Sequence, residues 1–536
     1  MRVGPASLAF IGRDNGALTF EKPVDAQILY TGRPFVDDRL LGNCLIDHHA
    51  LPAPDKIDGK FAALVVKLDG VELLTDCIGA GTVFYAQVEG CLYFGSHLGL
   101  VAAALPSAPE LNDLGVASQL AGIQAFDETH FRGIYRLEAG GRLSAIRNAD
   151  QSIDVRQTHG DGIRGLLDID VPPLTSASFR SMLDSGVARE GYDANSILML
   201  SGGRDSLALA LARAPTPTRC ATFGEPKSID VLRAKRRARR LGLEFSAVPF
   251  QDWTLETYLD EIVTLNAGCS GLQAAHNMVG FDWVADKANL ASIGYLGDVF
   301  RDSLFGVLEN GSDESAVIRV MALRLNDPIL KDVFAKERET LSAFIRDTYR
   351  DLARDVGQHR ALAMLRLKWH QARWISMSFD LCDWYLPISY PLVQRDLIAA
   401  WLQCDLNDPS DRNQFNLSLS EALAENGYHP NPRGSIPERV RNKCLAALAR
   451  LSQGGQVIHT CDWQAIVERS EFRPEAYDCG HERLSDYTRR SWEALEAQGF
   501  RTNVKPAVYT SAAIAAACRQ FSQSANQPAL SQISAA

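Results

Sequence analysis

The sequence predicts an α/β protein of two domains: an α+β sandwich, followed by a parallel-sheet domain with many added helices. Three observations support this fold class. A chain of 536 residues is too long for one ordinary hydrophobic core. Residues 1 to about 165 alternate short β-rich runs with glycine turns. From residue 196 onward, apolar runs alternate with helical stretches, which is the βαβ pattern of a parallel sheet.

Composition narrows the class of protein. Apolar residues make up 46% and charged residues 22% of the chain, as in soluble globular proteins. The net charge of -10 argues against a nucleic-acid partner, whose binding surface would be basic. We expect no membrane partner, because no apolar run is long enough to cross a bilayer. The 11 cysteines show no CxxC spacing, which predicts reduced thiols in a cytoplasmic protein.

The first domain is predicted to span residues 1–170. Stretches 61–70, 81–90 and 92–95 are predicted strands that pair with one another, and residues 112–120 form a predicted helix. A polar, glycine-rich stretch then ends in Val171-Pro-Pro-Leu174, where we place the domain boundary. The second domain is predicted to span residues 171–521, with a flexible tail over 522–536.

The second domain opens on the segment that carries the clearest chemistry. Residues 196–200 form a predicted buried strand, residues 201–206 a Ser-Gly-Gly-Arg-Asp-Ser turn, and a helix is predicted from Leu207. Free backbone N–H groups and the helix dipole favour an anion at such a turn. A carboxylate beside an anion indicates a Mg²⁺ ion that accompanies phosphates. The predicted phosphate-binding residues are Ser201, Gly202, Gly203, Asp205 and Ser206.

The βαβ pattern continues beyond this turn. Residues 219–223 and 244–248 are predicted strands, separated by a helix over 228–242. In such sheets ligands bind outside the carboxyl ends of the strands. Phe223 and Gly224 end the second strand and are therefore candidate adenosine contacts. Residues 303–382 are predicted to be strongly helical.

A second acidic turn follows another predicted strand. Residues 291–300 read Ala-Ser-Ile-Gly-Tyr-Leu-Gly-Asp-Val-Phe, in which a strand ends in a glycine turn with an aspartate. We expect Asp205 and Asp298 to flank one Mg²⁺-pyrophosphate, with Gly297 beside them, because two carboxylates are suitable hard ligands. Asp302 is the alternative to Asp298 for the same role.

The turn at 201–206 resembles the SGGxDS pyrophosphate loop of the N-type ATP pyrophosphatases, and the turn at 294–298 resembles their second metal-pyrophosphate motif. Residues 61–66, 76–85 and 95–100 resemble segments of the glutaminase-type (Ntn-like) domain of asparagine synthetases. The resemblance implies an asparagine synthetase-like amide ligase that uses ATP and Mg²⁺ to adenylate a carboxylate and releases pyrophosphate and AMP. Its first domain would be the glutaminase-type sandwich, and its second the PP-loop synthetase domain.

The N-terminal domain departs from that family at its nucleophile. Working glutaminases of this type use a cysteine at the mature N-terminus. Here Met1 is followed by Arg2, and the first cysteine is Cys44. We therefore expect a degenerate domain that supports the synthetase domain and hydrolyses no glutamine.

The family also carries a catalytic lysine near the C-terminus, which neutralises charge on the phosphates in the transition state. Asn431-Pro-Arg-Gly-Ser435 falls at the corresponding place, so Arg433 is the first candidate. Arg439, Arg441 and Lys443 lie close enough in the sequence to be alternatives.

Relatives without the N-terminal cysteine include lasso-peptide macrolactam synthetases and β-lactam synthetases. In the β-lactam enzymes, a tyrosine at the position of Tyr295 pairs with a glutamate to deprotonate the amine. No Asp or Glu lies between Asp355 and Asp380, where that partner would fall, which favours the lasso-peptide cyclase. That reaction implies a precursor peptide and its leader-processing protease as partners. A β-lactam or carbapenam-type synthetase, an ammonia-dependent asparagine synthetase and a non-catalytic binding protein are the alternatives.

Overall fold

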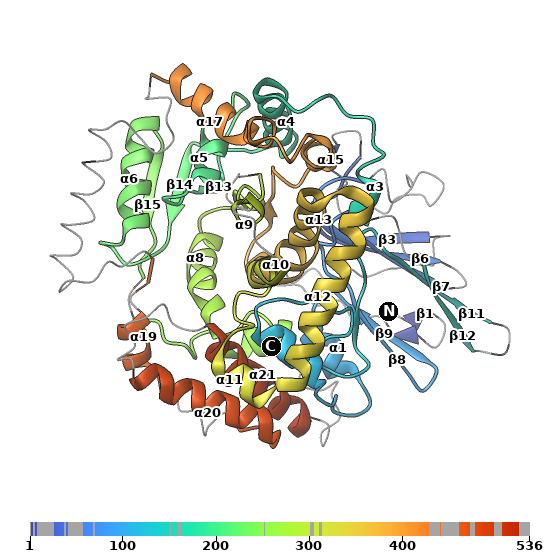
Figure 1. Cartoon of the computed structure of the whole chain (residues 1–536). Helices are drawn as coiled ribbons and strands as arrows, with labels where there is room; N and C mark the ends of the chain where they lie inside the picture. Colours follow the sequence, from blue (N-terminus) through green and yellow to red (C-terminus); the bar gives the residue numbers. More distant parts are fainter. Residues whose placement is uncertain are drawn as a thin grey trace.

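The protein is a mixed α/β structure with antiparallel sheets, one parallel sheet and many helices (Figure 1). The computed structural model describes residues 2–3, 6–7, 26–36, 39–40, 57–67, 70–148, 150, 152–158, 162–250, 252–300, 305–309, 314–427, 440, 460–461, 463–471, 478–497 and 506–524. The fold class predicted from the sequence is confirmed at this level.

Two antiparallel sheets face each other in the N-terminal part. The larger has the order β12 (Ile153–Thr158), β11 (Arg142–Arg147), β7 (Gly70–Thr75), β6 (Phe61–Lys67) and β3 (Ala26–Gly32). The smaller has the order β10 (Tyr135–Arg136), β8 (Phe84–Val88) and β9 (Cys91–Gly95). Because side chains alternate along a strand, Ala62, Leu64 and Val66 share one face of β6. They pack in one cluster with Tyr85 and Phe94 of the smaller sheet.

The strand pairing differs in part from the prediction. Stretches 81–90 and 92–95 do pair, as β8 with β9, whereas 61–70 pairs with β3 and β7 in the other sheet. Two further antiparallel pairs occur among the described residues of this part, β1 (Arg2–Val3) with β2 (Ala6–Ser7) and β4 (Phe35–Val36) with β5 (Arg39–Leu40). Helices α1 (Leu98–Ala104) and α2 (Asp113–Leu120) follow β9, and the Asn112 side chain caps α2 by accepting a hydrogen bond from the Leu114 N–H.

The parallel sheet has the order β15-β14-β13-β16-β17. Figure 1 labels three of its strands, β13, β14 and β15. Its strands are β13 (Ser196–Met199), β14 (Arg219–Thr222), β15 (Glu244–Ala247), β16 (Leu290–Ser292) and β17 (Ile388–Ser389). Strands β14 and β15 lie on one side of β13, and the later strands β16 and β17 lie on its other side. The order therefore reverses between β13 and β16, which is the point where open α/β sheets bind ligands.

Helices cover and extend this sheet. They are α3 (Gly162–Gly165), α4 (Ser176–Arg189), α5 (Arg204–Ala210), α6 (Ile229–Leu241), α7 (Leu259–Asn266), η3 (Leu272–Ala274), α8 (Ala275–Ala285), α9 (Gly306–Glu309), α10 (Glu314–Met321), α11 (Pro328–Val333), α12 (Ala335–Val356), α13 (Gln358–Leu365), η5 (Arg366–Ile375), α14 (Ser376–Asp383), α15 (Arg395–Gln403), α16 (Pro409–Arg412), α17 (Gln414–Glu425), α19 (Trp463–Arg469), α20 (Glu482–Ala497) and α21 (Pro506–Ser524). Helix α21 continues through Ser522, where the flexible tail was expected to begin.

The segment η5 is a π-helix of 10 residues between α13 and α14. Helical periodicity predicts the helix over this stretch, but not its wider hydrogen-bonding pattern. π-helical segments occur often at functional sites.

Across the described residues, no helix combines the length and the apolar character needed to span a bilayer. The cysteines of the described residues are all free thiols, as the sequence predicts.

A buried carboxylate organises the turn between the two antiparallel sheets. Asp76 follows β7, is 1% exposed and accepts hydrogen bonds from the backbone N–H groups of Phe61, Ile78, Ala80 and Gly81 at 2.6–3.2 Å. Backbone donors in the interior need such partners, because each unpaired one costs desolvation free energy.

We expect Asp76→Ala to lower the free energy of unfolding by about 3 to 4 kcal/mol, because it leaves these buried donors unpaired. Urea unfolding followed by circular dichroism measures the change. Asp154→Ala is the control: Asp154 pairs with the exposed Arg156 on β12, and its loss should change stability by less than about 0.5 kcal/mol. Equal effects of the two substitutions would contradict the role given to Asp76.

Candidate functional site

The turn after β13 closes on itself through its serines. The Ser201 N–H donates to Ser206 Oγ at 3.1 Å, and the Gly203 N–H donates to Ser201 Oγ at 3.0 Å. Helix α5 begins at Arg204, three residues before the predicted start, so Asp205 and Ser206 lie in its first turn. A carboxylate there is stabilised by the helix dipole even without a ligand.

The turn after β16 lies directly against Asp205. A Cβ added at Gly297 would come within 2.5 Å of Asp205 Cβ, and one at Gly294 within 2.7 Å of the Asp205 carbonyl carbon. Residue 296 takes a left-handed backbone with φ 72°, which ordinarily favours glycine, although it is a leucine here. The structure thus brings together the two acidic turns that the sequence singled out.

The sequence did not identify the residue that contacts Asp298. Gln371 Nε2, on η5, donates to both carboxylate oxygens of Asp298 at 3.1 and 3.0 Å. Arg366 is the first residue of η5, and its Nη2 lies 4.0 Å from Oδ2 of Asp298. Burial lowers the pKa of Arg366, and Asp298 opposes that shift. Asp302, the alternative second acid, lies outside the described residues.

The donor set at these turns suits Mg²⁺ bound together with phosphates. In proteins Mg²⁺ is usually held by one or two carboxylates, with phosphate oxygens and water completing the shell. Asp205 and Asp298 provide two carboxylates on touching turns, and that of Asp298 is 34% exposed. No group of three metal-ligating side chains occurs among the described residues, so they contain no all-protein metal cage.

The end of β14 is covered by a segment from far along the chain. The Glu225 N–H donates to the Thr460 carbonyl at 2.8 Å, and Thr460 Oγ1 donates to Asp230 at 2.7 Å. Gly224 is needed here, because its φ of 139° is rare for other residues and a Cβ would lie 2.9 Å from the Thr460 oxygen. Phe223 packs against Phe250 and is only half-buried, which leaves part of its ring available to a ligand.

The arginines near the loop have defined roles. Arg204 donates to Asn416 on α17 at 2.7 Å, so it contacts a neighbouring helix. Arg237, in the basic run of α6, donates to the Ser201 carbonyl at 3.3 Å and to the Gly203 carbonyl. Nothing in the sequence distinguishes Arg237 from the other arginines of this helix. The catalytic candidate Arg433 and its alternatives (Arg439, Arg441 and Lys443) lie outside the described residues.

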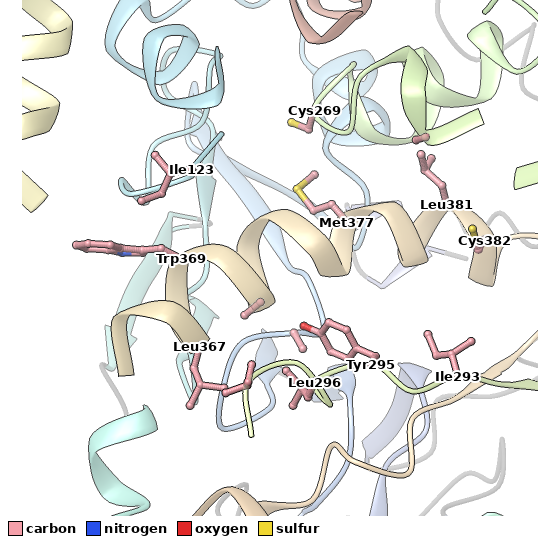
Figure 2. Close-up of a cluster of buried hydrophobic side chains, with 14 of the residues drawn as sticks. Ile123, Cys269, Ile293, Tyr295, Leu296, Leu367, Trp369, Met377, Leu381 and Cys382 are labelled. Atoms are coloured by element: carbon pink, nitrogen blue, oxygen red, sulfur yellow. The ribbon is translucent and has the colours of Figure 1, made fainter. Parts of the chain in front are cut away.

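Tyr295 lies between the second acidic turn and the helix η5–α14 (Figure 2). It is 5% exposed, and its hydroxyl has no hydrogen-bond partner among the described residues. Burial raises the pKa of Tyr295 well above its ordinary value, and the carboxylates of Asp76, Asp380 and Asp298 raise it further. A phenolate is therefore disfavoured at neutral pH, so this geometry does not suit a catalytic base.

No protein-family model matches the chain, and no curated protein matches it either. The chemistry of the site is therefore argued from its own residues.

We expect Gly297→Ala to lower the free energy of unfolding by about 1 to 3 kcal/mol, because the added methyl group would overlap Asp205. Gly306→Ala is the matched control, since a Cβ there meets nothing within 4 Å. Chemical denaturation measures both. A Gly297→Ala protein as stable as the control variant would contradict the close contact of the two turns.

Proposed function

We propose that this protein is an ATP-dependent, AMP-forming amide ligase. The observation that carries the proposal is the contact of the two acidic glycine turns, which follow the neighbouring parallel strands β13 and β16. This position is the strand-order reversal, where open α/β sheets bind nucleotides. A Ser-Gly-Gly turn that precedes a helix favours phosphates, and two carboxylates beside it favour the Mg²⁺ that accompanies them.

The reaction has two steps. An oxygen of the substrate carboxylate attacks the α-phosphorus of ATP, the bond to the bridging oxygen breaks, and pyrophosphate leaves. An amine then attacks the acyl carbon: a C–N bond forms, AMP leaves with the electron pair of the broken C–O bond, and the amine proton passes to solvent. Ser201 and Ser206, with the backbone of their turn, would hold phosphate oxygens. Asp205 and Asp298 would hold Mg²⁺, which supplies positive charge to the leaving pyrophosphate.

The strand order predicts where each substrate binds. Phe223 and Gly224 end β14 and would contact the nucleoside, while the phosphates lie between β13 and β16. The acyl group and the amine must then lie over the opposite side, at the ends of β16 and β17. Tyr295 and Tyr390 follow these two strands, and their rings pack edge to face with centroids 5.8 Å apart. The cation that balances phosphate charge would come from Arg433, or from Lys443.

For the substrate we propose a peptide whose N-terminal amine closes a macrolactam on an internal Asp or Glu side chain, as in lasso-peptide cyclases. The state of Tyr295 supports this choice over a β-lactam synthetase, which needs a tyrosine–carboxylate base. Its hydroxyl has no carboxylate partner among the described residues, and its pKa is raised. The proposed partners are a precursor peptide and the protease that removes its leader.

We expect Asp205→Asn to reduce AMP formation about a hundredfold or more, because it removes one of two carboxylates that would hold Mg²⁺. ATP–pyrophosphate exchange with synthetic peptides that carry an internal Asp or Glu measures the first step. Asp260→Asn is the control, because Asp260 also lies in the first turn of a helix but on α7. Full exchange activity in the Asp205→Asn protein would contradict the metal assignment, and no exchange by the wild type with any carboxylate would favour a non-catalytic binding protein.

With a free N-terminal amine, such a peptide should give a product lighter by one water that resists aminopeptidase, because its amine has become part of a ring. Mass spectrometry after incubation with ATP and Mg²⁺ detects it. The same peptide with an acetylated N-terminus is the control and should give no ring. Amidation of the peptide by added ammonia, without ring closure, would contradict the macrolactam proposal and favour an asparagine synthetase-like reaction.

A further inference from the structure

A lysine of the N-terminal sandwich is buried against the parallel-sheet part of the chain. Lys60 precedes β6, and its side chain is 2% exposed. Its Nζ donates to Asp380 Oδ1 at 2.6 Å and Asp383 Oδ2 at 3.2 Å, both on α14, and to the Tyr390 hydroxyl at 3.0 Å. Three donors of one ammonium group therefore hold together a helix and the end of strand β17.

The carboxylates of this cluster are fully engaged by the protein itself. The second oxygen of Asp380 accepts from Thr82 Oγ1 at 3.2 Å, and the second oxygen of Asp383 accepts from the Ile388 N–H at 2.9 Å. Tyr390 also donates to Asp383 at 2.8 Å. Since every ammonium proton and every carboxylate oxygen has a protein partner, the cluster holds protein groups in place.

The group that Lys60 holds most directly is the ring of Tyr390. Besides its hydrogen bond, the ammonium lies 4.4 Å from the centroid of that ring, a cation–π contact. Tyr390 in turn packs edge to face on Tyr295. Phe379, on α14, also packs on Tyr295. A displacement of Tyr390 or of α14 would therefore displace the ring of Tyr295, and with it the wall that Tyr295 and Tyr390 would form beside the proposed acyl group and amine.

We propose that Lys60 is a positioning residue for the second reaction step: through Tyr390 and Tyr295 it sets the wall that orients the attacking amine. The inference rests on the proposed function, which places the acyl group and the amine at that wall. It also assigns the N-terminal sandwich a part in a reaction whose other groups all lie in the second part of the chain. Positioning matters for rate, since a displacement of about 1 Å can cost about a hundredfold.

Lys60→Met tests the inference when the two steps are measured separately. Synthetic peptides with a free N-terminus and an internal Asp or Glu are incubated with ATP and Mg²⁺. Ring closure reports the oriented intramolecular amine. Hydroxylamine, added to the N-acetylated peptides, attacks the activated acyl carbon from solution and displaces AMP, so the hydroxamate reports the first step alone. Arg33→Met is the control, because Arg33, which follows β3 and is 14% exposed, also pairs with a carboxylate outside the sandwich, the buried Glu190 ahead of β13, at 2.5 Å.

We expect Lys60→Met to slow ring closure about a hundredfold while hydroxamate formation changes less than about threefold. Arg33→Met should change the two rates in parallel. Tyr390→Phe keeps the ring and removes its hydrogen bonds to Lys60 and Asp383, so it should reproduce the selective loss and serves if Lys60→Met does not fold. Parallel losses of both rates, or no loss of ring closure, in Lys60→Met and Tyr390→Phe would overturn the inference. A wild-type protein that forms neither product would instead overturn the proposed function on which it rests.

Discussion

The contact between the two acidic turns is the constraint on which the site depends. Parallel pairing of Leu198 with Ser292 sends both turns from the same edge of the sheet, so their backbones must pass each other closely. At 2.5 Å from Asp205 there is no room for a side chain at residue 297. The left-handed backbone of Leu296, about 1 to 3 kcal/mol less favourable than an ordinary conformation, is held by the same packing. Two turns that each carry a carboxylate, Asp205 and Asp298, thus touch each other, which is an arrangement suited to a cation.

Local patterns predicted four strands of the parallel sheet, β13 to β16, because each lies between turn signals, but they did not predict β17. They also identified both aspartates and the glycine turns around them. Phosphate binding at Ser201 to Ser206 stays a prediction, as do the roles of Asp298, Phe223 and Arg433. In the N-terminal part, the strands within 61–70, 81–90 and 92–95 were predicted, whereas β3, β7, β11, β12 and several strand partners were not. Residues 61–67 pair with residues 26–32, and alternate side chains of β6 are buried in two different clusters, one on each face. A strand that is buried on both faces shows no alternation of apolar and polar residues, so its own sequence does not indicate its partner.

The side chains missed by sequence reasoning all act across long separations. Gln371 meets Asp298 from a helix 73 residues away, and Lys60 meets Asp380 across 320 residues. A glutamine in a helix and a lysine before a strand are ordinary in composition, so no local signal distinguishes them. Arg237 shows a milder form of the same limit, because it reaches the loop carbonyls of Ser201 and Gly203 from a helix 34 to 36 residues further along the chain.

The N-terminal sandwich also supports the second part of the chain at η5. Arg136, 2% exposed, donates to the carbonyls of Ala372 at 2.7 Å and Arg373 at 3.1 Å. These carbonyls belong to the π-helical segment, whose wider turns leave backbone acceptors open to outside donors. Burial and the nearby Arg373 lower the pKa of Arg136 to about 10, which still leaves it charged at neutral pH. The same segment places Gln371 on Asp298, so a guanidinium of the sandwich steadies the helix that orients a proposed metal ligand. Loss of the sandwich would therefore disturb the site at two points, η5 and Tyr390, although both of these lie outside the sandwich.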